Sequence, residues 1–346
     1  MSTVTTPTNG TYTSKDFVSN QDVKWCPGCG DYSILKQVQN VFPDLGIPKE
    51  QFAFVAGIGC SSRFPYYMDT YGVHSIHGRA FAVATGLKAT RPDLSVWVVT
   101  GDGDALSIGG NHFIHMLRRN PDLNVLLFNN EIYGLTKGQY SPTSPTGTVT
   151  KSTPFGSLDE PFNPAELALG AKSTFFARTM DRDPKHMQVV LKRAHAHKGT
   201  SLIEIYQNCN VFNDGAFFIY SEKETKKSHG IFVEHGKPLV FGTNEEFGIR
   251  MEGFKPVIVN IAESGISVND LWIHDERDKT KASILARFFM DPKTPGHLPR
   301  PFGVFYVEDR RTLDDQMEDQ VKELQAKKGK TPLDKILSGD KTWVIN

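Results

Sequence analysis

The sequence lacks several features by which common protein classes are recognised. Lys plus Arg and Asp plus Glu both number 39, so no charge excess indicates a surface for nucleic acid or membrane. No apolar run approaches the roughly 18 residues of a transmembrane helix. The Ser- and Thr-rich segment 1–20 has no apolar core of a secretion signal. We therefore expect a cytoplasmic protein that binds neither nucleic acid nor membrane.

Cysteine is also scarce. The chain has four, Cys26, Cys29, Cys60 and Cys209. A cytosolic chain keeps its thiols reduced, so a disulfide framework is not expected. Four thiols that include a C-x-x-C pair are, however, the number that fills a metal or iron–sulfur site.

What the sequence contains is an alternation of helical and extended patterns. With 346 residues, 39% of them hydrophobic and 23% charged, it is typical of a globular α/β protein. Apolar spacing predicts helices over 31–42, 80–90, 105–119, 164–172 and 184–198, and strands over 52–56, 94–100, 123–128 and 201–206. Such alternation favours parallel strands joined by right-handed helical crossovers.

The pattern is interrupted twice. Residues 140–164 contain five prolines among many Ser, Thr and Gly, which predicts a long and functional loop. After about residue 220 the alternation weakens, with a possible strand at 257–261 and a charged helix over 312–328. We expect a polar segment at 1–20, a cofactor-binding domain over 21–220, and an extension over 221–346 that packs on the core or on a partner.

The most informative stretch begins with Gly101-Asp102-Gly103, directly after a predicted strand. A helix and a second strand follow, and that strand ends at Asn129-Asn130, with 26 residues between Gly103 and Asn130. Both ends should therefore return to the same edge of the sheet, where open parallel sheets bind ligands. Carboxylate and amide oxygens suit Mg²⁺, and glycines let backbone N–H groups approach a diphosphate. A GDG alone would be typical of a turn.

The spacing of the four cysteines indicates a second binding site. In Trp25-Cys26-Pro27-Gly28-Cys29-Gly30 the short spacing lets two thiolates reach one centre. A zinc knuckle and a redox dithiol are the alternatives. Zinc sites usually carry two close pairs, whereas Cys60 and Cys209 are single and distant, and an iron–sulfur cluster tolerates such spacing.

Both motifs resemble one family, the β subunits of the 2-oxoacid:ferredoxin oxidoreductases. GDG followed by NNEIYGLTKGQ resembles its thiamine-diphosphate motif, and CPGCGD, GIGCSS and QNCN resemble its cysteine pattern. The resemblance covers roughly residues 24–210 and implies a parallel-sheet thiamine-diphosphate-binding fold with helices on both faces, plus a C-terminal extension. Some members carry extra C-x-x-C-x-x-C-x-x-x-C segments, which this chain lacks.

The resemblance also implies a set of site residues. It implies Mg²⁺ bound by Asp102, Asn130 and the Ile132 carbonyl, and one [4Fe–4S] cluster bound by Cys26, Cys29, Cys60 and Cys209. Thiamine-diphosphate contacts would come from Asp31, Gly59, Ser61, His77, Gly101, Gly103, Asp104, Asn130, Tyr133, Gly134, Leu135 and Thr136. Asn129, the first of the pair, is more typical of a cap or turn than of a metal ligand.

The implied reaction is oxidative decarboxylation of a 2-oxoacid, with coenzyme A accepting the acyl group and ferredoxin the electrons, or the reverse carboxylation. Arg79 and Lys137, in HGRA and LTKGQ, resemble the two-subunit enzymes that accept larger 2-oxoacids such as 2-oxoglutarate. Structural ion pairing by Arg79 and phosphate contact by Lys137 are the alternatives, and His77 is a further candidate near the reacting carbon. Pyruvate or a broad range of 2-oxoacids remains the other substrate assignment.

The sequence offers no convincing candidate for the glutamate that thiamine enzymes use to activate the cofactor. The resemblance implies that an α-type subunit carries it, in an αβ or α₂β₂ assembly. Two other classes stay open at this point. A non-redox thiamine lyase leaves the four cysteines without a role, and a non-catalytic metal-binding subunit leaves GDG and NN without one.

Overall fold

The computed structural model describes residues 12–262, 265–329, 331–343 and 345. Its centre is an eight-stranded sheet with the strand order β2-β1-β3-β4-β8-β7-β13-β9. The strands are β1 (Phe52–Ala56), β2 (Tyr71–His74), β3 (Ser95–Gly101), β4 (Leu123–Asn129), β7 (Phe175–Met180), β8 (Ser201–Tyr206), β9 (Gly230–Val233) and β13 (Arg300–Val307). Every neighbouring pair is parallel except β7 and β13. The expected parallel α/β sheet is thus confirmed, with two strands at one edge, β13 and β9, that run opposite to the other six.

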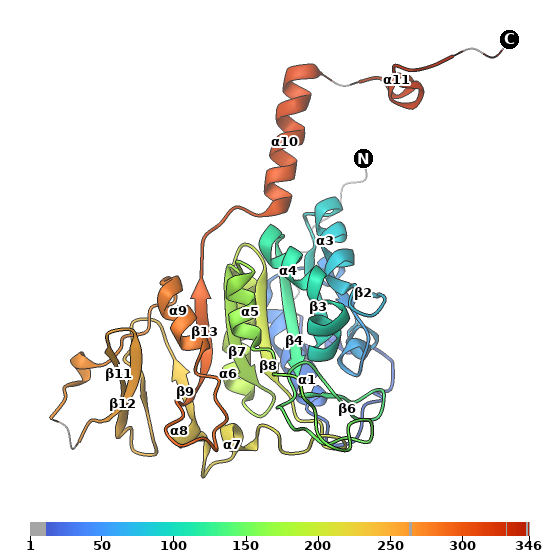
Figure 1. Cartoon of the computed structure of the whole chain (residues 1–346). Helices are drawn as coiled ribbons and strands as arrows, with labels where there is room; N and C mark the ends of the chain where they lie inside the picture. The colour runs from blue at the N-terminus through green and yellow to red at the C-terminus, as the bar shows by residue number, and fades with distance from the viewer. Residues whose placement is uncertain (1–11, 263–264, 330, 344, 346) are drawn as a thin grey trace.

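Helices cover both faces of this sheet (Figure 1). The helices are α1 (Asp31–Val41), α2 (Phe64–Tyr67), α3 (Ala80–Thr90), α4 (Gly110–Arg119), α5 (Pro164–Gly170), α6 (Pro184–Ala196), α7 (Phe218–Ser221), α8 (Lys226–His229), α9 (Lys279–Ala286), α10 (Leu313–Lys328) and α11 (Leu333–Ser338). None of the helices in these described ranges is long and apolar enough to cross a membrane.

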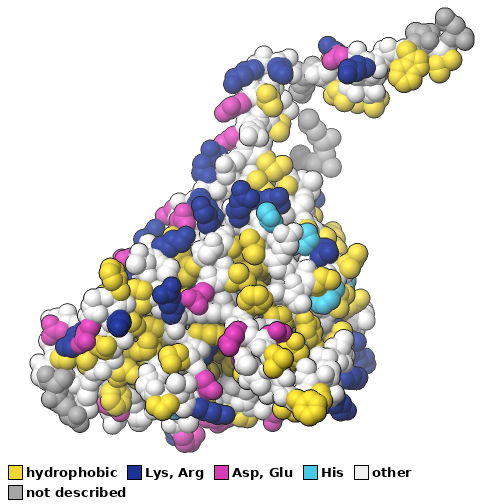
Figure 2. All heavy atoms as spheres, in the orientation of Figure 1, with side chains coloured by type: hydrophobic (Ala, Val, Ile, Leu, Met, Phe, Trp, Pro, Cys, Tyr) yellow, Lys and Arg dark blue, Asp and Glu magenta, His cyan; other side chains and the backbone are white. Residues whose placement is uncertain are grey.

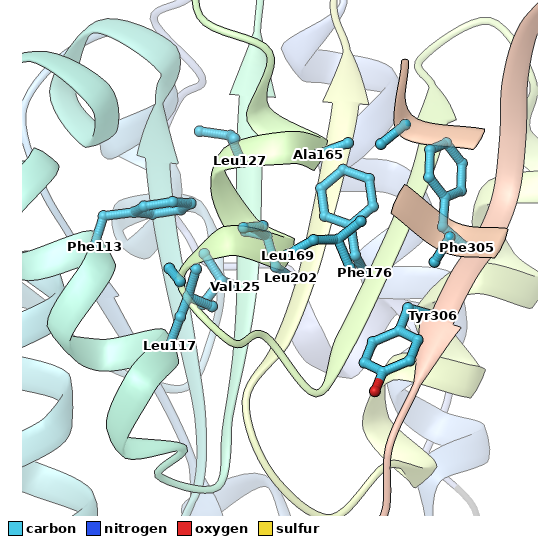
Figure 3. Close-up of a cluster of buried hydrophobic side chains, with 14 of the residues drawn as sticks. Phe113, Leu117, Val125, Leu127, Ala165, Leu169, Phe176, Leu202, Phe305 and Tyr306 are labelled. Atoms are coloured by element: carbon cyan, nitrogen blue, oxygen red, sulfur yellow. The ribbon is translucent and has the colours of Figure 1, made fainter. Parts of the chain in front are cut away.

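Two hydrophobic cores lie on opposite faces because side chains alternate along each strand. In β3, Val96 and Val98 face the core formed with α3, α4, α5 and α9, whereas Trp97 and Val99 face the core formed with α1 and α6. Figure 3 shows the first core, where Phe113 and Leu117 of α4 pack over Val125 of β4. Strands buried on both faces explain why β3 and β4 are nearly continuous apolar runs.

The segment after residue 220 contributes to the central sheet as well as to the periphery. β9 and β13 complete its far edge, and β10 (Val240–Phe241), β11 (Phe247–Glu252) and β12 (Lys255–Asn260) form a separate antiparallel sheet. α10 and α11 project away from the body (Figure 1). Acidic and basic side chains are interspersed on the face shown in Figure 2, as the zero net charge suggests. Residues 1–11 of the expected polar segment lie outside the described residues.

The helix expected over 105–119 is wrong in one respect. A π-helical turn at Asp104–Ile108 precedes α4, and Ser107 within that turn has non-helical angles (φ −90°, ψ −105°). Gly109, at the start of α4, packs closely on Gly78, since a Cβ on Gly78 would lie 2.6 Å from the Gly109 nitrogen. Such π-turns are frequent at functional sites.

Burial lowers the pKa of His186, in α6, to about 4. Its Nδ1 lies 2.8 Å from the Thr179 hydroxyl, and its ring meets Phe232 edge-on. Since the unfolded value is near 6.5, the neutral ring stabilises the fold fully above that pH, and the contribution is lost as pH falls from about 6.5 towards 4. We expect His186→Gln to reduce the loss of unfolding free energy between pH 6.5 and 4.5 by about 2 to 3 kcal/mol.

The measurement is urea unfolding of both proteins across this pH range. His235→Gln serves as the control because the side chain of His235 is exposed. Wild-type and His186→Gln curves that run parallel would contradict the expectation.

Candidate functional site

The site lies where β3 and β4 end side by side. These strands pair in parallel, with Gly101 opposite Phe128, so that Asp102 and Asn130 follow at the same edge of the sheet. This confirms the arrangement expected from the spacing of GDG and NN. A cleft opens at that edge, and all the residues expected to contact thiamine diphosphate line it. Its lining is Asp31, Ile58, Gly59, Cys60, Ser61, His77, Gly101, Asp102, Gly103, Asp104, Phe128, Asn130, Ile132, Tyr133, Gly134, Leu135 and Thr136.

Asp102 is buried and held by hydroxyl groups. Ser141 and Thr143, from the loop after β6 (Gln139–Tyr140), donate to its Oδ2 at 2.5 and 2.6 Å. Burial raises the pKa of Asp102, and these hydrogen bonds oppose the rise. A cation in the cleft would therefore meet a carboxylate already oriented by the protein.

Asp104 has a different role from its neighbour two residues earlier. One of its oxygens accepts from the backbone N–H of Ile58 (3.1 Å) and of Gly78 (2.7 Å) and lies 2.5 Å from His77 Nδ1. The other accepts from the Thr100 hydroxyl at 2.6 Å. Asp104 thus joins the loops after β1 and β2 to the end of β3, and its oxygens are occupied by the chain itself.

The turn after β4 is fixed by amide side chains. Asn129 donates to Glu204 (2.8 Å), and its oxygen accepts from the Glu131 N–H (3.3 Å). This confirms Asn129 as a turn residue. The Asn130 oxygen accepts from the Ile132 N–H at 3.2 Å, while its amide donates to Gln207 at 2.8 Å. The Glu131 backbone has a positive φ of 55°, which turns the chain sharply towards the cleft.

The four cysteines are free thiols near the same cleft. A Cβ on Gly134 would lie 3.5 Å from the Cys209 sulfur and 3.6 Å from the Cys60 sulfur, so both cysteines lie beside the Gly134 backbone. Gln207 donates to the Cys29 sulfur at 3.2 Å. Burial, with Asp31 nearby, raises the pKa of Cys29 and raises that of Cys60 to about 12.

Comparisons with known proteins agree with this geometry. Residues 57–205 match the family model for the C-terminal thiamine-pyrophosphate-binding domain of thiamine pyrophosphate enzymes. The chain is 50% identical over 334 residues to the 2-oxoglutarate oxidoreductase subunit KorB of Mycobacterium tuberculosis, covering 96% of this chain and 88% of that protein. It is 40% identical to subunit beta of 2-oxoacid:ferredoxin oxidoreductase 2 from Aeropyrum pernix, in a match that covers 67% of this chain and 74% of that protein. The chain belongs to the 2-oxoacid:ferredoxin oxidoreductase β-subunit family.

A solved structure supports the same fold. The 2-oxoglutarate:ferredoxin oxidoreductase from Magnetococcus marinus, with 2-oxoglutarate, coenzyme A and succinyl-CoA bound, matches with a TM-score of 0.74 and 33% identity. The match covers 96% of this chain and 97% of that one. Because it extends over nearly the whole chain, the segment after residue 220 belongs to the shared architecture.

The residues that line the cleft fit thiamine diphosphate, because one buried polar atom among them lacks a hydrogen-bond partner that the cofactor could supply. Asp31 Oδ2 is buried and has no hydrogen-bond partner, although such atoms are normally paired. Burial raises the pKa of Asp31 to about 7, and Asp181 adds to the rise. The cleft thus contains a carboxyl group that a bound ring nitrogen or amino group could satisfy.

Single-ion sites are a separate matter. Among the described residues, no three His, Cys, Asp or Glu side chains gather closely enough to hold a metal ion. A cluster has different requirements from a single ion, since its irons present separate corners to their ligands.

Two of the residues expected to contact substrate do not line the cleft. Arg79 precedes α3, where its guanidinium lies 3.4 Å from the Ile108 carbonyl. Lys137 is exposed in the turn after Thr136 and has a positive φ of 81°. His77 does line the cleft, with its ring turned to Asp104.

The sequence reasoning missed a groove that contains an arginine. It adjoins the cleft through Ile58, Gly59 and Leu135, and it also contains Arg63, His74 and the ion pair of Lys24 with Asp22. Arg63 follows GIGCSS directly, so its position next to a cluster motif was the available signal. Ser141 and Thr143 were missed because they lie about forty residues from Asp102 in a loop without regular structure.

Proposed function

We propose that this chain is the β subunit of a 2-oxoglutarate:ferredoxin oxidoreductase that works in the cytoplasm, where its four thiols stay reduced. The reaction joins 2-oxoglutarate and coenzyme A to give succinyl-CoA, CO₂ and a proton while two oxidised ferredoxins each take one electron, or runs in reverse. The observation that carries the proposal is that Cys60 lines the thiamine cleft and shares Gly134 with Cys209. A cluster bound by these cysteines would adjoin the cleft proposed for thiamine diphosphate and could take electrons from it.

Each group in the cleft has a chemical task in this proposal. Thiamine diphosphate, when bound, supplies the electron sink for decarboxylation, and the [4Fe–4S] cluster accepts electrons singly. Asp102, Asn130 and the Ile132 carbonyl supply the hard oxygens that Mg²⁺ prefers. Cys26, Cys29, Cys60 and Cys209 would hold the cluster, and Cys26 is the one of the four that is exposed.

The groove beside the cleft supports the choice of substrate. 2-Oxoglutarate has a second carboxylate that pyruvate lacks, and Arg63 supplies a positive charge in the groove that continues from the cleft, where Lys24 is paired with Asp22. A guanidinium can bind a carboxylate through two parallel hydrogen bonds. We infer that Arg63 binds the distal carboxylate, with Lys137 as the candidate that the sequence motif alone suggests.

The cleft also supports the need for a partner. Among the described residues that line it, none is a glutamate, and Asp104 is fully engaged by its own chain. We infer that an α-type subunit supplies the activating glutamate, in an αβ or α₂β₂ assembly.

The cluster is tested first because it separates this function from a plain thiamine lyase. The chain, purified without oxygen, should contain about four irons and four sulfides and absorb broadly near about 400 nm. Cys209→Ser should lose the absorption, whereas Ser152→Ala, in the exposed part of the loop, is the control that should keep it. Zinc, or no metal, in the wild-type preparation would overturn the redox assignment.

The substrate assignment predicts a selective defect. Arg63→Met should raise the KM for 2-oxoglutarate about 10- to 100-fold, the loss expected for a charged hydrogen bond, and change the KM for pyruvate much less. Steady-state kinetics of the assembled enzyme with both acids gives the comparison. Arg91→Met, which removes an exposed arginine paired with Asp93, is the control. Lys137→Gly, measured alongside, tests the motif residue, and equal effects on both acids would refute the assignment.

The partner proposal predicts that the chain alone does not turn over. Without the α-type subunit, reduction of methyl viologen should be at least about 100-fold slower than in the complex, because general acid–base assistance is missing. Substantial turnover by the isolated, cluster-containing chain would show that the activating group lies within it.

A further inference from the structure

Two hydroxyl groups of the segment after β6 donate hydrogen bonds to the same carboxylate oxygen of Asp102. The Ser141 and Thr143 hydroxyls lie 2.5 and 2.6 Å from Asp102 Oδ2. All three residues are no more than 2% exposed. Because both donors act on the same oxygen, Oδ1 is the oxygen left for a cation.

The donors themselves have little freedom to move. The Ser141 N–H donates to the Ser144 hydroxyl at 2.7 Å, and that hydroxyl donates to the Glu131 carbonyl at 2.5 Å. Thr143 Oγ1 also lies 2.9 Å from Asn129 Oδ1, so its one proton is shared between two acceptors. The segment is therefore anchored to the turn that follows β4 and to the residue that follows β3.

We propose that Ser141 and Thr143 are positioning residues that restrict Asp102 to one-oxygen coordination and thereby favour Mg²⁺ over Ca²⁺ at this site. The proposal rests on the metal-binding role of Asp102 given above. Mg²⁺ requires near-octahedral geometry, which single carboxylate oxygens satisfy, whereas Ca²⁺ accepts six to eight oxygens and often takes both from one carboxylate. We refer to Ser141 and Thr143 with Asp102 as the hydroxyl clamp.

The hydroxyl clamp opposes two-oxygen coordination for a simple reason. For Asp102 to offer both oxygens, Oδ2 would have to give up two hydrogen bonds strengthened by its charge. The buried Ser141 hydroxyl would then lose its closest acceptor, which is itself costly, and the Thr143 hydroxyl would keep only Asn129 Oδ1. Neither change is required when only Oδ1 binds the ion.

The test measures metal preference by binding, independently of turnover. The full chain is titrated with Mg²⁺ and, separately, with Ca²⁺ in the presence of thiamine diphosphate, by isothermal titration calorimetry. In Ser141→Ala/Thr143→Val, the preference for Mg²⁺ should fall about tenfold or more, mainly because Ca²⁺ binds more tightly. Thermal melts check folding, and Thr143→Val alone replaces the double variant if the latter does not fold.

Two matched variants separate the clamp from general damage to the loop. Ser157→Ala removes a buried hydroxyl of the same segment that contacts Pro145 and Thr148 but neither Asp102 nor the two donors, and Thr143→Ser keeps the donor, so both should retain the wild-type preference. A clamp variant with the wild-type preference, or a wild type that does not prefer Mg²⁺, overturns the proposal. If Asp102→Asn binds Mg²⁺ and thiamine diphosphate like the wild type, the proposed metal site itself is wrong.

Discussion

The parallel pairing of β3 with β4 is the constraint on which the site depends. The pairing places Gly101 opposite Phe128, and this register brings an acid and an amide to the same edge although they are far apart in the sequence. A slip of one residue would turn every side chain of a strand to the other face. Both faces of β3 and β4 are buried in separate cores, so such a slip would be strongly unfavourable, and the core thereby fixes the geometry of the cleft.

The second requirement is that buried charges at the strand ends have partners. Glu204 accepts hydrogen bonds from Arg178 at 2.7 Å and from Asn129 at 2.8 Å. Neither Glu204 nor Arg178 is exposed. A buried ion pair adds little net stability, but removing one partner typically costs about 3 to 5 kcal/mol. The pair is therefore better understood as a means of holding Asn129, and with it the turn beside the cleft, in one conformation. Asp104 likewise holds the loops after β1 and β2 in place, through its hydrogen bonds with the Ile58 and Gly78 N–H groups.

Local patterns could be predicted from the sequence, and long-range ones could not. β1, α3 and β8 were predicted with the bounds observed, because each is a strongly periodic or continuous apolar run. β7 was missed because the fully buried Arg178 interrupts its apolar pattern, and only the distant Glu204 explains that burial. β13 was missed because Pro301 and Gly303 are usually strand breakers. The cleft residues within the two motifs were implied by the family resemblance that those local motifs carry, whereas Arg63 and the hydroxyl clamp depend on contacts across the chain.

The cysteines show how this fold would couple to the proposed cluster. Burial raises the pKa of Cys60 to about 12 and raises that of Cys29 as well, so without iron these thiols stay protonated at neutral pH. A cluster binds thiolates, and its assembly must therefore release protons and replace desolvated thiols with strong bonds. Cys60 lines the thiamine cleft, and Gln207 joins Cys29 to Asn130. A cluster on these cysteines would thus be connected through Gln207 to the turn proposed to bind the diphosphate, and the two proposed cofactor sites would share this contact.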